Sequence, residues 1–356
     1  MSAGDFSGTM PVSDRHSFDQ GLLERWLQDH LPGFARLARI EQFRGGQSNP
    51  TFRLTAEGGA QYVLRKKPAG ALLPSAHAVD REFRVISALH GSAVPVARAL
   101  CLCRDEGVIG TMFYVMEYVS GRNFWDATFP GMTPPERAAL YDEMNRVMVA
   151  LHTLDYAAAG LSDYGKPGNY FARQIARWSG QYRASETERI EAMEKLLTWL
   201  PANIPAGEET ALVHGDYRLD NLIFDARSAR MLAVVDWELS TLGHPLADFA
   251  YHVMLWRLPH GERGGLEGLD LLTLGIPTES EYVAAYCART SRPPIEPRVW
   301  EFCMAYNVFR IACIQQGIMK RVLEGTAASR HAREAGGKAR ATAEFAWGQV
   351  ERHLGG

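Results

Sequence analysis

Three polar side chains near the middle of the chain have the types and the spacing of a phosphoryl-transfer site. Asn221 follows Asp216 by five residues, and Asp236 comes after two further apolar runs. Phosphoryl transfer asks a protein mainly to align an alcohol with the phosphorus and to neutralise charge on the phosphate oxygens. We therefore expect Asp216 to orient a hydroxyl and collect its proton. Asn221 and Asp236 are expected to hold Mg²⁺ on ATP, because magnesium prefers hard oxygen ligands.

Two residues before Asp216 should shape the turn that carries it. We expect His214 and Gly215 to form a tight turn that aims the Asp216 carboxylate at its substrate. An Asp and an Asn at this spacing also occur by chance, so an ordinary hairpin with surface acids stays an alternative for the three polar residues alone. The interpretation therefore depends on the elements around them.

The first 118 residues are expected to be mostly strands. Residues 1–16 are predicted to be a flexible arm, and residues 17–118 a strand-rich N-lobe. Ser17 is expected to be the N-cap of the first helix, with Gln20 completing a capping box. Alternation and turn residues predict strands at 40–43, 51–55, 61–66, 99–103 and 111–118, and helical spacing predicts a helix at 79–89.

The pattern changes after residue 118, and residues 119–356 are expected to form a mostly helical C-lobe. Within it, only the segment 211–236 is predicted to form short strands. Residues 257–270, rich in glycine and charge, are expected to be a mobile surface loop. Apolar residues at helical spacing predict helices at 133–154, 169–185, 187–199, 244–256, 279–289, 297–324 and 332–353.

Composition limits the classes of protein to which the chain can belong. Its 356 residues are 46% hydrophobic and 22% charged, with a formal net charge of −3, which suits about two domains or one two-lobed unit. No basic stripe is evident, so nucleic acid is not an expected partner. No signal peptide or long apolar run is evident, so we expect a cytoplasmic protein with no membrane partner. The five cysteines lack metal-site spacing and are expected to be buried, reduced thiols.

The C-lobe motifs resemble those of the aminoglycoside phosphotransferase family, small-molecule kinases with a protein-kinase-like fold. The likeness rests on His214-Gly215-Asp216 with Asn221, and on Val234-Val235-Asp236-Trp237-Glu238. It implies an α+β, two-lobed fold with a small antiparallel-sheet N-lobe and a mostly helical C-lobe. It also implies that Asp216, with His214 beside it, is the catalytic base, and that Asn221 and Asp236 bind Mg²⁺ on ATP. Asp248 is expected to brace the catalytic loop.

The resemblance extends more weakly to a nucleotide-binding N-lobe. Gly45-Gly46-Gln47-Ser48-Asn49 occupies the place of the phosphate-covering loop, although a plain glycine turn stays an alternative. Tyr62-Val63-Leu64-Arg65 corresponds to the strand that normally ends in a phosphate-pairing lysine. Strand alternation favours Arg65 for that role, with Lys66 on the opposite face as the other choice.

Two further N-lobe segments are implied to complete the nucleotide site. Glu82 corresponds to the helix carboxylate that positions the cation, and an ordinary solvated glutamate is its alternative. Met116-Glu117-Tyr118-Val119 corresponds to the hinge, in which backbone groups of Glu117 and Val119 hydrogen-bond adenine.

A closer resemblance is to the kinase-like domain fused to certain acyl-CoA dehydrogenases and to its free-standing bacterial relatives. It rests on Gly45 to Thr51, on Tyr62 to Arg65, and on the segment Leu73-Pro74-Ser75-Ala76-His77 that leads to Glu82. This likeness implies a hydroxylated small-molecule acceptor of the hydroxyacyl-CoA type, such as a 4-hydroxyacyl-CoA. The basic and aromatic character of the C-lobe helices suits an anionic or amphipathic acceptor, unless these are ordinary surface residues. The candidate substrate contacts are Glu238, Arg173, Arg177, Trp178, Tyr182 and Arg310.

Other functions stay open at this point. An aminoglycoside-type antibiotic phosphotransferase uses the same chemistry with a different acceptor pocket. A nucleotide-binding pseudokinase is slightly favoured by Arg65 in the lysine position and opposed by the intact Asp216, Asn221 and Asp236. Nothing in the chain resembles the flavin site of an acyl-CoA dehydrogenase. A protein kinase regulated by loop phosphorylation is disfavoured, because Asp-Phe-Gly, Ala-Pro-Glu and an activation segment are missing.

Overall fold

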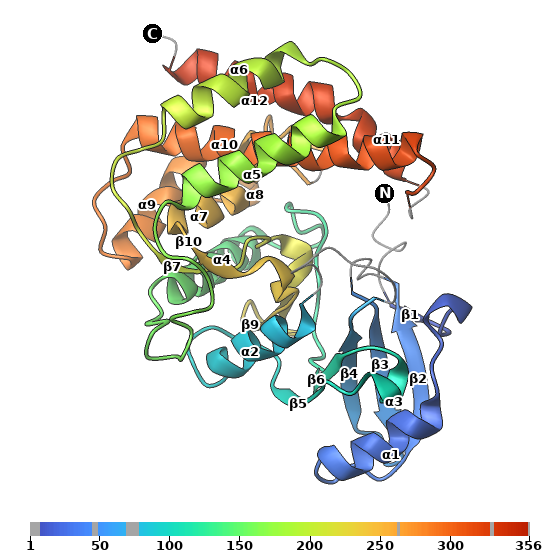
Figure 1. Ribbon diagram of the computed structural model, residues 1–356. Coiled ribbons are helices and arrows are strands. Elements are labelled where there is room, and N and C mark those ends of the chain that lie inside the picture. Colours follow the sequence, from blue (N-terminus) through green and yellow to red (C-terminus); the bar gives the residue numbers. More distant parts are fainter. Residues whose placement is uncertain (1–7, 45–48, 69–77, 262–263, 328–330, 355–356) are drawn as a thin grey trace.

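A six-stranded antiparallel sheet forms the centre of the N-terminal lobe (Figure 1). The computed structural model describes residues 8–44, 49–68, 78–261, 264–327 and 331–354. The strand order in the sheet is β1-β2-β3-β4-β6-β5. The strands are β1 (Thr9–Met10), β2 (Leu37–Phe43), β3 (Thr51–Ala56), β4 (Gln61–Lys66), β5 (Ala99–Cys103) and β6 (Phe113–Glu117).

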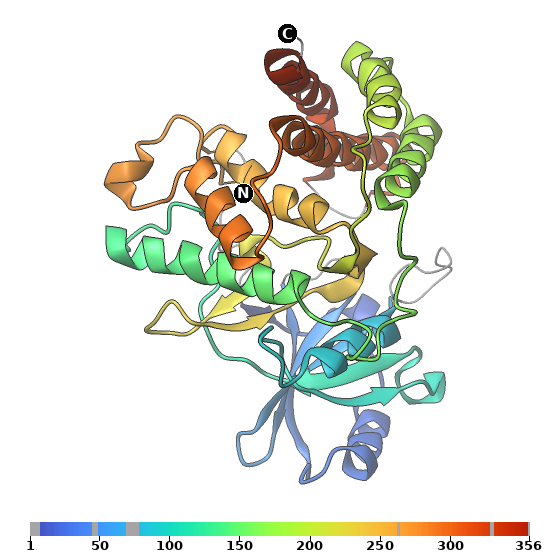
Figure 2. The ribbon, with the colours of Figure 1, turned by 90° about the vertical axis from the view of Figure 1, so that its left-hand side faces the viewer.

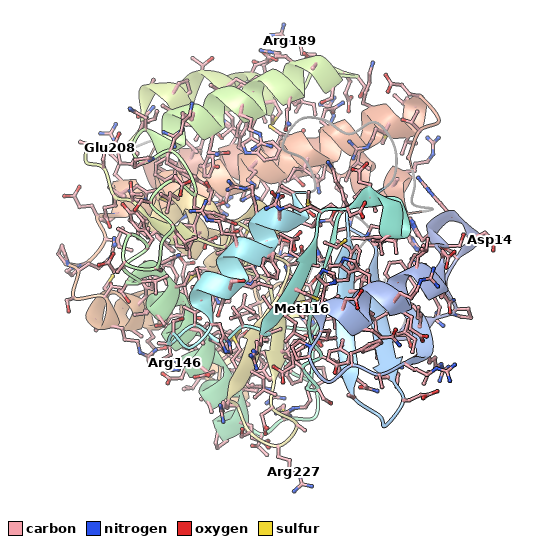
Figure 3. All side chains as sticks on the ribbon, turned by 60° about the horizontal axis from the view of Figure 1, so that its bottom comes forward. Asp14, Met116, Arg146, Arg189, Glu208 and Arg227 are labelled. Atoms are coloured by element: carbon pink, nitrogen blue, oxygen red, sulfur yellow. The ribbon has the colours of Figure 1, made fainter. Side chains whose placement is uncertain are left out.

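Helices cover both faces of this sheet, so its central strand β4 is buried on both sides. Leu64 pairs with Val115 of β6 and packs with Leu23 and Leu27 of α1 (Gln20–His30) in one apolar cluster. Arg65, the next residue, points to the other face, where α2 (Val79–Leu89) packs against β5 and β6. Met116 of β6 lies beside α2 in Figure 3. The alternation of side chains along β4 therefore places Leu64 on a buried apolar face and Arg65 on the opposite face, which is also buried and carries the charge.

The start of the chain is more ordered than the sequence suggested. Of the predicted flexible arm, residues 8–16 add the edge strand β1 and the 3₁₀ helix η2 (Asp14–His16) to the lobe. The Thr9 hydroxyl donates to Glu41, which fixes β1 on β2. The first helix also begins later than predicted. Its N-cap is Asp19, whose carboxylate accepts the Leu22 N–H at 2.9 Å, in place of Ser17.

The helix α2 joins the two lobes. Its apolar side chains Val79, Val85, Ile86 and Leu89 belong to the large core of the C-terminal lobe and not to the core under α1. The helix also packs on η4 (Trp237–Leu239), which directly follows the predicted metal ligand Asp236. A carboxylate on α2 is thereby placed between the sheet and the C-lobe.

Helices form most of the C-terminal lobe, as predicted. In Figure 2, α4 lies between the short strands and α9. The short strands form two antiparallel pairs, β7 (Ala211–Val213) with β10 (Thr241–Gly243), and β8 (Leu222–Phe224) with β9 (Met231–Val234). The longer helices are α4 (Pro134–His152), α5 (Tyr170–Ser185), α6 (Glu191–Ala202), α7 (Pro245–Val253), α9 (Glu279–Arg289), α10 (Pro297–Leu323) and α12 (Ala339–Leu354).

Several predicted helices have different bounds in the structure. The predicted helix at 244–256 divides into α7 and the 3₁₀ helix η5 (Met254–Arg257), and the helix at 187–199 begins and ends later as α6. The predicted helix at 332–353 divides into α11 (Ala332–Gly337) and α12. At that division Gly336 packs so closely on Met319 of α10 that a Cβ would lie 2.7 Å from the Met319 backbone nitrogen.

Two short helices replace segments predicted as connections. The short helix α3 (Glu106–Ile109) connects β5 to β6, and α8 (Leu271–Leu274) precedes α9. The expected mobile loop at 257–270 is anchored in its described part, because Leu266 is buried and its N–H donates to Leu255. The glycine and charge content of the segment predicted a mobile loop, but the burial of Leu266 anchors it.

The predicted state of the cysteines is confirmed, since Cys101, Cys103, Cys287, Cys303 and Cys313 are all buried and unpaired. Among the helices of the described ranges, none combines the length and the apolar character that a membrane crossing requires.

Candidate active site

The turn that carries Asp216 is held by one buried carboxylate. Asp248 on α7 accepts the backbone N–H of His214 at 2.7 Å and that of Gly215 at 2.8 Å. Gly215 has a φ of 81°, and a Cβ there would lie 2.7 Å from the Leu239 carbonyl oxygen. Only glycine fits this turn without strain, so the predicted turn and the bracing role of Asp248 agree with the structure.

The charge of Asp248 is stabilised within the core. Burial favours the neutral acid, but hydrogen bonds from His152 and from the His214 backbone outweigh it and lower the pKa of Asp248. His152 Nε2 lies 3.3 Å from the Asp248 carboxylate. A charged carboxylate that receives several hydrogen bonds is therefore part of the folded core.

The His214 side chain is a positioning group. Its ring is fully buried and packs on the Trp237 ring, with centroids 4.7 Å apart. Its Nδ1 accepts the Asp216 N–H at 3.2 Å, and its Nε2 lies 3.1 Å from the Val235 carbonyl oxygen. The predicted place of His214 in the turn is what the structure has, and its buried ring positions the Asp216 backbone.

Asp216, Asn221 and Asp236 come together at one hairpin. Asn221 is the residue before β8, and Asp236 is the second residue after β9. The two strands pair Leu222 with Val234, so these ends of the strands lie side by side. Asn221 Nδ2 donates to the Asp216 backbone oxygen at 2.9 Å. Asp236 has a φ of 66°, a conformation that aspartate tolerates better than most residues. The ordinary hairpin with scattered surface acids is therefore not what the chain forms.

From the N-lobe, Arg65 reaches the same place. Its Nε lies 2.8 Å from Glu82 Oε2, an ion-pair distance at which the N–H does not point along a good hydrogen bond. The Arg65 Nη2 nitrogen lies 2.5 Å from Asp236 Oδ1 and 3.7 Å from Glu238 Oε2. Burial opposes the charge, but the carboxylates of Glu82 and Asp236 raise the pKa of Arg65 above its usual value, so it stays charged.

Asn49 ties the end of the predicted phosphate-covering loop into this cluster. Its side-chain amide donates to Glu82 Oε1 at 2.8 Å and to Glu238 Oε2 at 3.1 Å. Burial and the nearby Asp236 charge raise the pKa of Glu238 to about 7. The predicted residues Gly45, Gly46, Gln47 and Ser48 lie outside the described residues, as does the Leu73 to His77 segment.

Lys66, the other choice for the phosphate-pairing cation, lies on the opposite face of the sheet. Its ammonium group packs over the rings of Phe18 and Phe52, at 5.0 and 5.8 Å from their centroids. Burial lowers the pKa of Lys66. Lys66 therefore does not join the Arg65 cluster, which corrects its inclusion among the nucleotide contacts.

The predicted hinge, Met116 to Val119, begins within the last two residues of β6. The Glu117 N–H donates to the Arg98 carbonyl at 2.9 Å, so this group belongs to the sheet. The adenine-binding role of Glu117 and Val119 rests on their remaining backbone groups and stays a prediction.

The candidate substrate contacts fall into two sets. Arg177 and Trp178 of α5 are partly accessible, and Glu238 belongs to the Arg65 cluster. The others are used inside the lobe: Tyr182 is fully buried, Arg173 donates to the backbone oxygens of Lys166 and Gly168, and Arg310 donates to the Gly215 backbone oxygen. The sequence showed the basic character of these helices but not which side chains fold back on the backbone.

Two residues of the site were missed by the sequence analysis. The Tyr251 hydroxyl lies 2.5 Å from Asp216 Oδ1, and Arg218 Nε lies 3.2 Å from the same oxygen. Tyr251 stands three residues after Asp248 on α7, and this helical spacing was a usable signal. Arg218 lies two residues after Asp216, inside the recognised motif.

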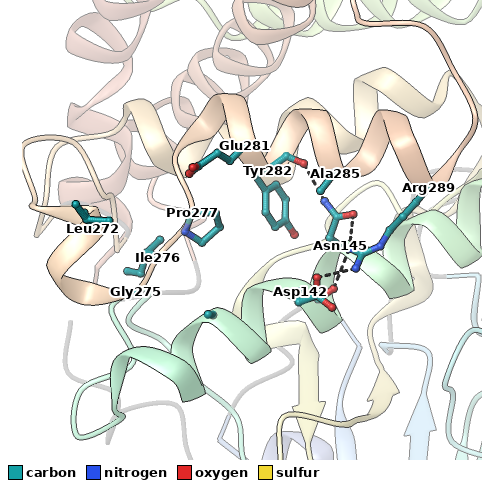
Figure 4. A pocket seen from close by; sticks show the side chains of 11 residues that line it. Asp142, Asn145, Leu272, Gly275, Ile276, Pro277, Glu281, Tyr282, Ala285 and Arg289 are labelled. Atoms are coloured by element: carbon teal, nitrogen blue, oxygen red, sulfur yellow. Dashed lines mark hydrogen bonds and ion pairs between the residues drawn. The ribbon is translucent and has the colours of Figure 1, made fainter.

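A pocket of about 360 Å³ lies elsewhere, between α4 and the α8–α9 segment (Figure 4). At one end, Arg289 is paired with Asp142 at 2.6 Å and bonded to Asn145 at 2.9 Å. None of its lining residues belongs to the site described above, and its charges are already paired. The geometry of the polar residues around Asp216, and not this hollow, therefore locates the candidate active site.

Most of this chain is similar in sequence to known proteins. The sequence pattern of the phosphotransferase enzyme family, APH, matches residues 39–290. Acyl-CoA dehydrogenase family member 10 from Mus musculus is 46% identical over 343 residues, which cover 95% of this chain and 32% of that protein. Family member 11 from the same organism is 45% identical over 332 residues, covering 91% and 42%. The chain thus spans less than half the length of these relatives.

A solved structure gives the same result for the fold. A candidate aminoglycoside phosphotransferase from Ralstonia eutropha has a TM-score of 0.86 and 54% identity to this chain, covering 94% of this chain and 99% of that one. The predicted α+β, two-lobed, protein-kinase-like fold is confirmed by this match.

Removing the Asp248 carboxylate should destabilise the fold. An Asp248→Ala change leaves the buried His214 and Gly215 N–H groups without their acceptor, and each such unsatisfied group costs about 1–3 kcal/mol. Because the folded pKa of Asp248 is lowered, its contribution is present above the ordinary pKa of 3.8 and is lost as the pH falls below it. Urea unfolding at pH 7 should show the full loss, and the difference from wild type should shrink below pH 3.8.

The matched control is Asp29→Ala, an exposed aspartate on α1 that should change stability by less than about 0.5 kcal/mol. Equal stability of Asp248→Ala and the control at pH 7 would contradict the bracing role.

Proposed function

The chain belongs to the phosphotransferase enzyme family, and on this basis we propose that it transfers the γ-phosphate of ATP, bound with Mg²⁺, to a hydroxyl of a small metabolite. We further propose that the metabolite is a hydroxyacyl-CoA thioester, such as a 4-hydroxyacyl-CoA. One observation carries the proposal: Arg65 of the N-lobe pairs with Asp236 of the C-lobe, next to the hairpin that holds Asn221 beside Asp216. A cation, two oxygen ligands and a carboxylate for the hydroxyl are thereby gathered in one place.

The residues present fit a magnesium–nucleotide complex. Asn221 uses its amide nitrogen on the Asp216 backbone, which directs its oxygen elsewhere, and the Asp236 side chain is 34% exposed. An amide oxygen and a carboxylate are ligands that Mg²⁺ takes together with phosphate oxygens and water. When bound, Mg²⁺ neutralises charge on the phosphate oxygens.

Arg65, Asn49 and Asp216 align the phosphates of ATP with the acceptor hydroxyl. Arg65, held by Glu82, is directed at the phosphates, and Asn49 fixes the end of the phosphate-covering loop on Glu82 and Glu238. Asp216 orients the acceptor hydroxyl toward the γ-phosphorus. As the new oxygen–phosphorus bond forms, the bond from the γ-phosphorus to the bridging oxygen of ADP breaks, and the hydroxyl proton passes to the Asp216 carboxylate.

The surroundings of the catalytic loop support an acceptor with an apolar part and a negative charge. Leu239, which contacts Gly215, is 45% exposed, and Ile314, one turn after Arg310 on α10, is 39% exposed. Arg218 places a half-exposed guanidinium beside Asp216, and Arg177 lies on α5. Exposed apolar residues and arginines suit an acyl-CoA better than a polycationic sugar.

The two alternative functions are an aminoglycoside phosphotransferase and a nucleotide-binding pseudokinase. The Ralstonia eutropha protein is described as a candidate aminoglycoside phosphotransferase, so aminoglycosides are the second acceptor class to test. A pseudokinase is disfavoured because Arg65 makes the Glu82 ion pair that the corresponding lysine would make. The dehydrogenase named in the relatives is not proposed, since this chain matches less than half of each.

Arg65→Ala should weaken MgATP binding more than Lys66→Ala. Loss of a charge-assisted bond to phosphate is worth about 1.5–3 kcal/mol, or about 10–100-fold in affinity. Lys66, under Phe18 and Phe52, should matter for stability only. Calorimetric titration of folded variants with MgATP tests the ranking, and the reverse ranking would assign the phosphate role to Lys66.

Asp236→Ala should abolish the dependence of ATP binding on magnesium. The wild type should bind ATP tightly only when Mg²⁺ is present, and the variant should bind it equally weakly with Mg²⁺ or EDTA. Asp225→Ala serves as the matched control and should bind MgATP as wild type does, because this partly exposed aspartate bonds within the turn between β8 and β9, to Arg227 and Ser228. A metal-dependent Asp236→Ala protein would show that the ligand is misassigned.

Asp216→Asn should lower phosphate transfer about 10²–10⁴-fold, the usual contribution of a proton acceptor. Its affinity for MgATP should stay unchanged, because Asp216 is not a proposed metal ligand. Transfer of labelled phosphate to a 4-hydroxyacyl-CoA and to kanamycin should be compared, with the thioester preferred. Preference for kanamycin would replace the proposed acceptor, and wild-type turnover by Asp216→Asn would overturn the mechanism.

A further inference from the structure

The carboxylate of Asp216 is held asymmetrically. Oδ1 receives the Tyr251 hydroxyl at 2.5 Å and lies 3.2 Å from Arg218 Nε. Among the residues that the structure describes, Oδ2 receives only a weak bond, from Asn221 Nδ2 at 3.3 Å, and that amide makes its shorter bond to the Asp216 backbone oxygen. The two oxygens of one carboxylate are therefore in different states before any substrate binds.

Tyr251 is itself fixed from two sides. Its ring is buried on α7, and the Arg310 guanidinium of α10 packs over it at 5.1 Å from the centroid. The same guanidinium packs over the Trp178 ring of α5 at 5.7 Å and donates to the Gly215 backbone oxygen at 2.8 Å. Arg310, read from the sequence as a substrate contact, thus connects Tyr251 to the turn that carries Asp216.

The phenol is a donor to Asp216 under ordinary conditions. Burial, together with the neighbouring Asp216 charge, raises the pKa of Tyr251, so its proton stays on the oxygen. The helix that carries Tyr251 also carries Asp248, three residues earlier and on the same side. One helix therefore fixes both the backbone of the catalytic loop and the rotation of its carboxylate.

We propose that Tyr251 is a positioning residue that selects the reacting oxygen of Asp216. It occupies Oδ1, and Oδ2 is left to accept the hydrogen bond and then the proton of the acceptor hydroxyl. This inference rests on the proposed phosphate transfer and goes beyond it, because it assigns the proton to one atom. Without the phenol, the carboxylate can rotate about its Cβ–Cγ bond, and the hydroxyl loses its fixed partner. Displacements of about 1 Å in such a geometry cost up to about 10²-fold in rate.

The test is a kinetic cycle with Tyr251→Phe and Asp216→Asn, using ATP with the acceptor preferred in the labelled-phosphate assay. Tyr251→Phe should lower kcat about 10–100-fold, with MgATP affinity and the KM for the acceptor nearly unchanged. In the Asp216→Asn background the same change should lower kcat by less than about threefold, because the phenol acts only through the carboxylate. Tyr282→Phe is the matched control: it removes a buried phenol that lies 2.9 Å from His252 and does not touch Asp216.

The outcomes separate the inference from the proposed function. Wild-type kcat in Tyr251→Phe, or an equal loss in both backgrounds, would overturn the role of Tyr251 while the phosphate transfer stands. A wild type that transfers no phosphate would overturn the proposed function.

In that case proton NMR still tests the contact that the inference needs. A Tyr251 hydroxyl proton, identified by its loss in Tyr251→Phe, should also be lost in Asp216→Ala and kept in Tyr282→Phe. Persistence of this signal in Asp216→Ala would contradict the contact.

Discussion

The buried charge of Arg65 is the interaction on which the joining of the two lobes depends. A guanidinium removed from water is unfavourable unless carboxylates surround it, and here they come from α2 and from the segment after β9. Satisfying this one charge requires the sheet, α2 and the C-lobe hairpin to meet at a fixed distance. The same requirement brings the cation of the N-lobe to the predicted magnesium ligand Asp236, so the electrostatics of the fold and of the site are one arrangement.

Within the C-lobe, α7 has the corresponding role for the loop that carries Asp216. It contributes Asp248 to two backbone N–H groups and Tyr251 to the carboxylate itself. All three contacts are short, the two from Asp248 are buried and that of Tyr251 is partly buried, and Arg310 of α10 bonds to the same turn through the Gly215 backbone oxygen. A rigid helix can hold a side chain more precisely than a loop can, which suits a reaction in which alignment contributes much of the rate.

The chain shares its two-lobed unit with much longer relatives. Sequence identity of 46% with a mouse acyl-CoA dehydrogenase family member covers 32% of that protein, so the common part is the two-lobed unit. Arg173 and Arg310, two of the predicted acceptor contacts, donate to backbone oxygens inside the lobe. Arg218, Leu239 and Ile314 replace them as the proposed acceptor contacts. Of these residues, Arg218 and Leu239 lie beside the turn that carries Asp216, and Ile314 lies one turn after Arg310 on α10.

The sequence by itself determined the change from a strand-rich to a helix-rich lobe, the strand β4 with its correct ends, the convergence of Asp216, Asn221 and Asp236, and the choice of Arg65 over Lys66 as the residue facing Glu82. These features follow from local periodicity and from a compact motif, both of which survive in one dimension. Tertiary structure alone decided that residues 8–16 pair with the sheet, that Arg310 braces Gly215, and that Tyr251 holds Asp216. Such contacts join distant segments or depend on side-chain rotation, and local patterns carry no information about either because burial and packing fix them only after the chain has folded.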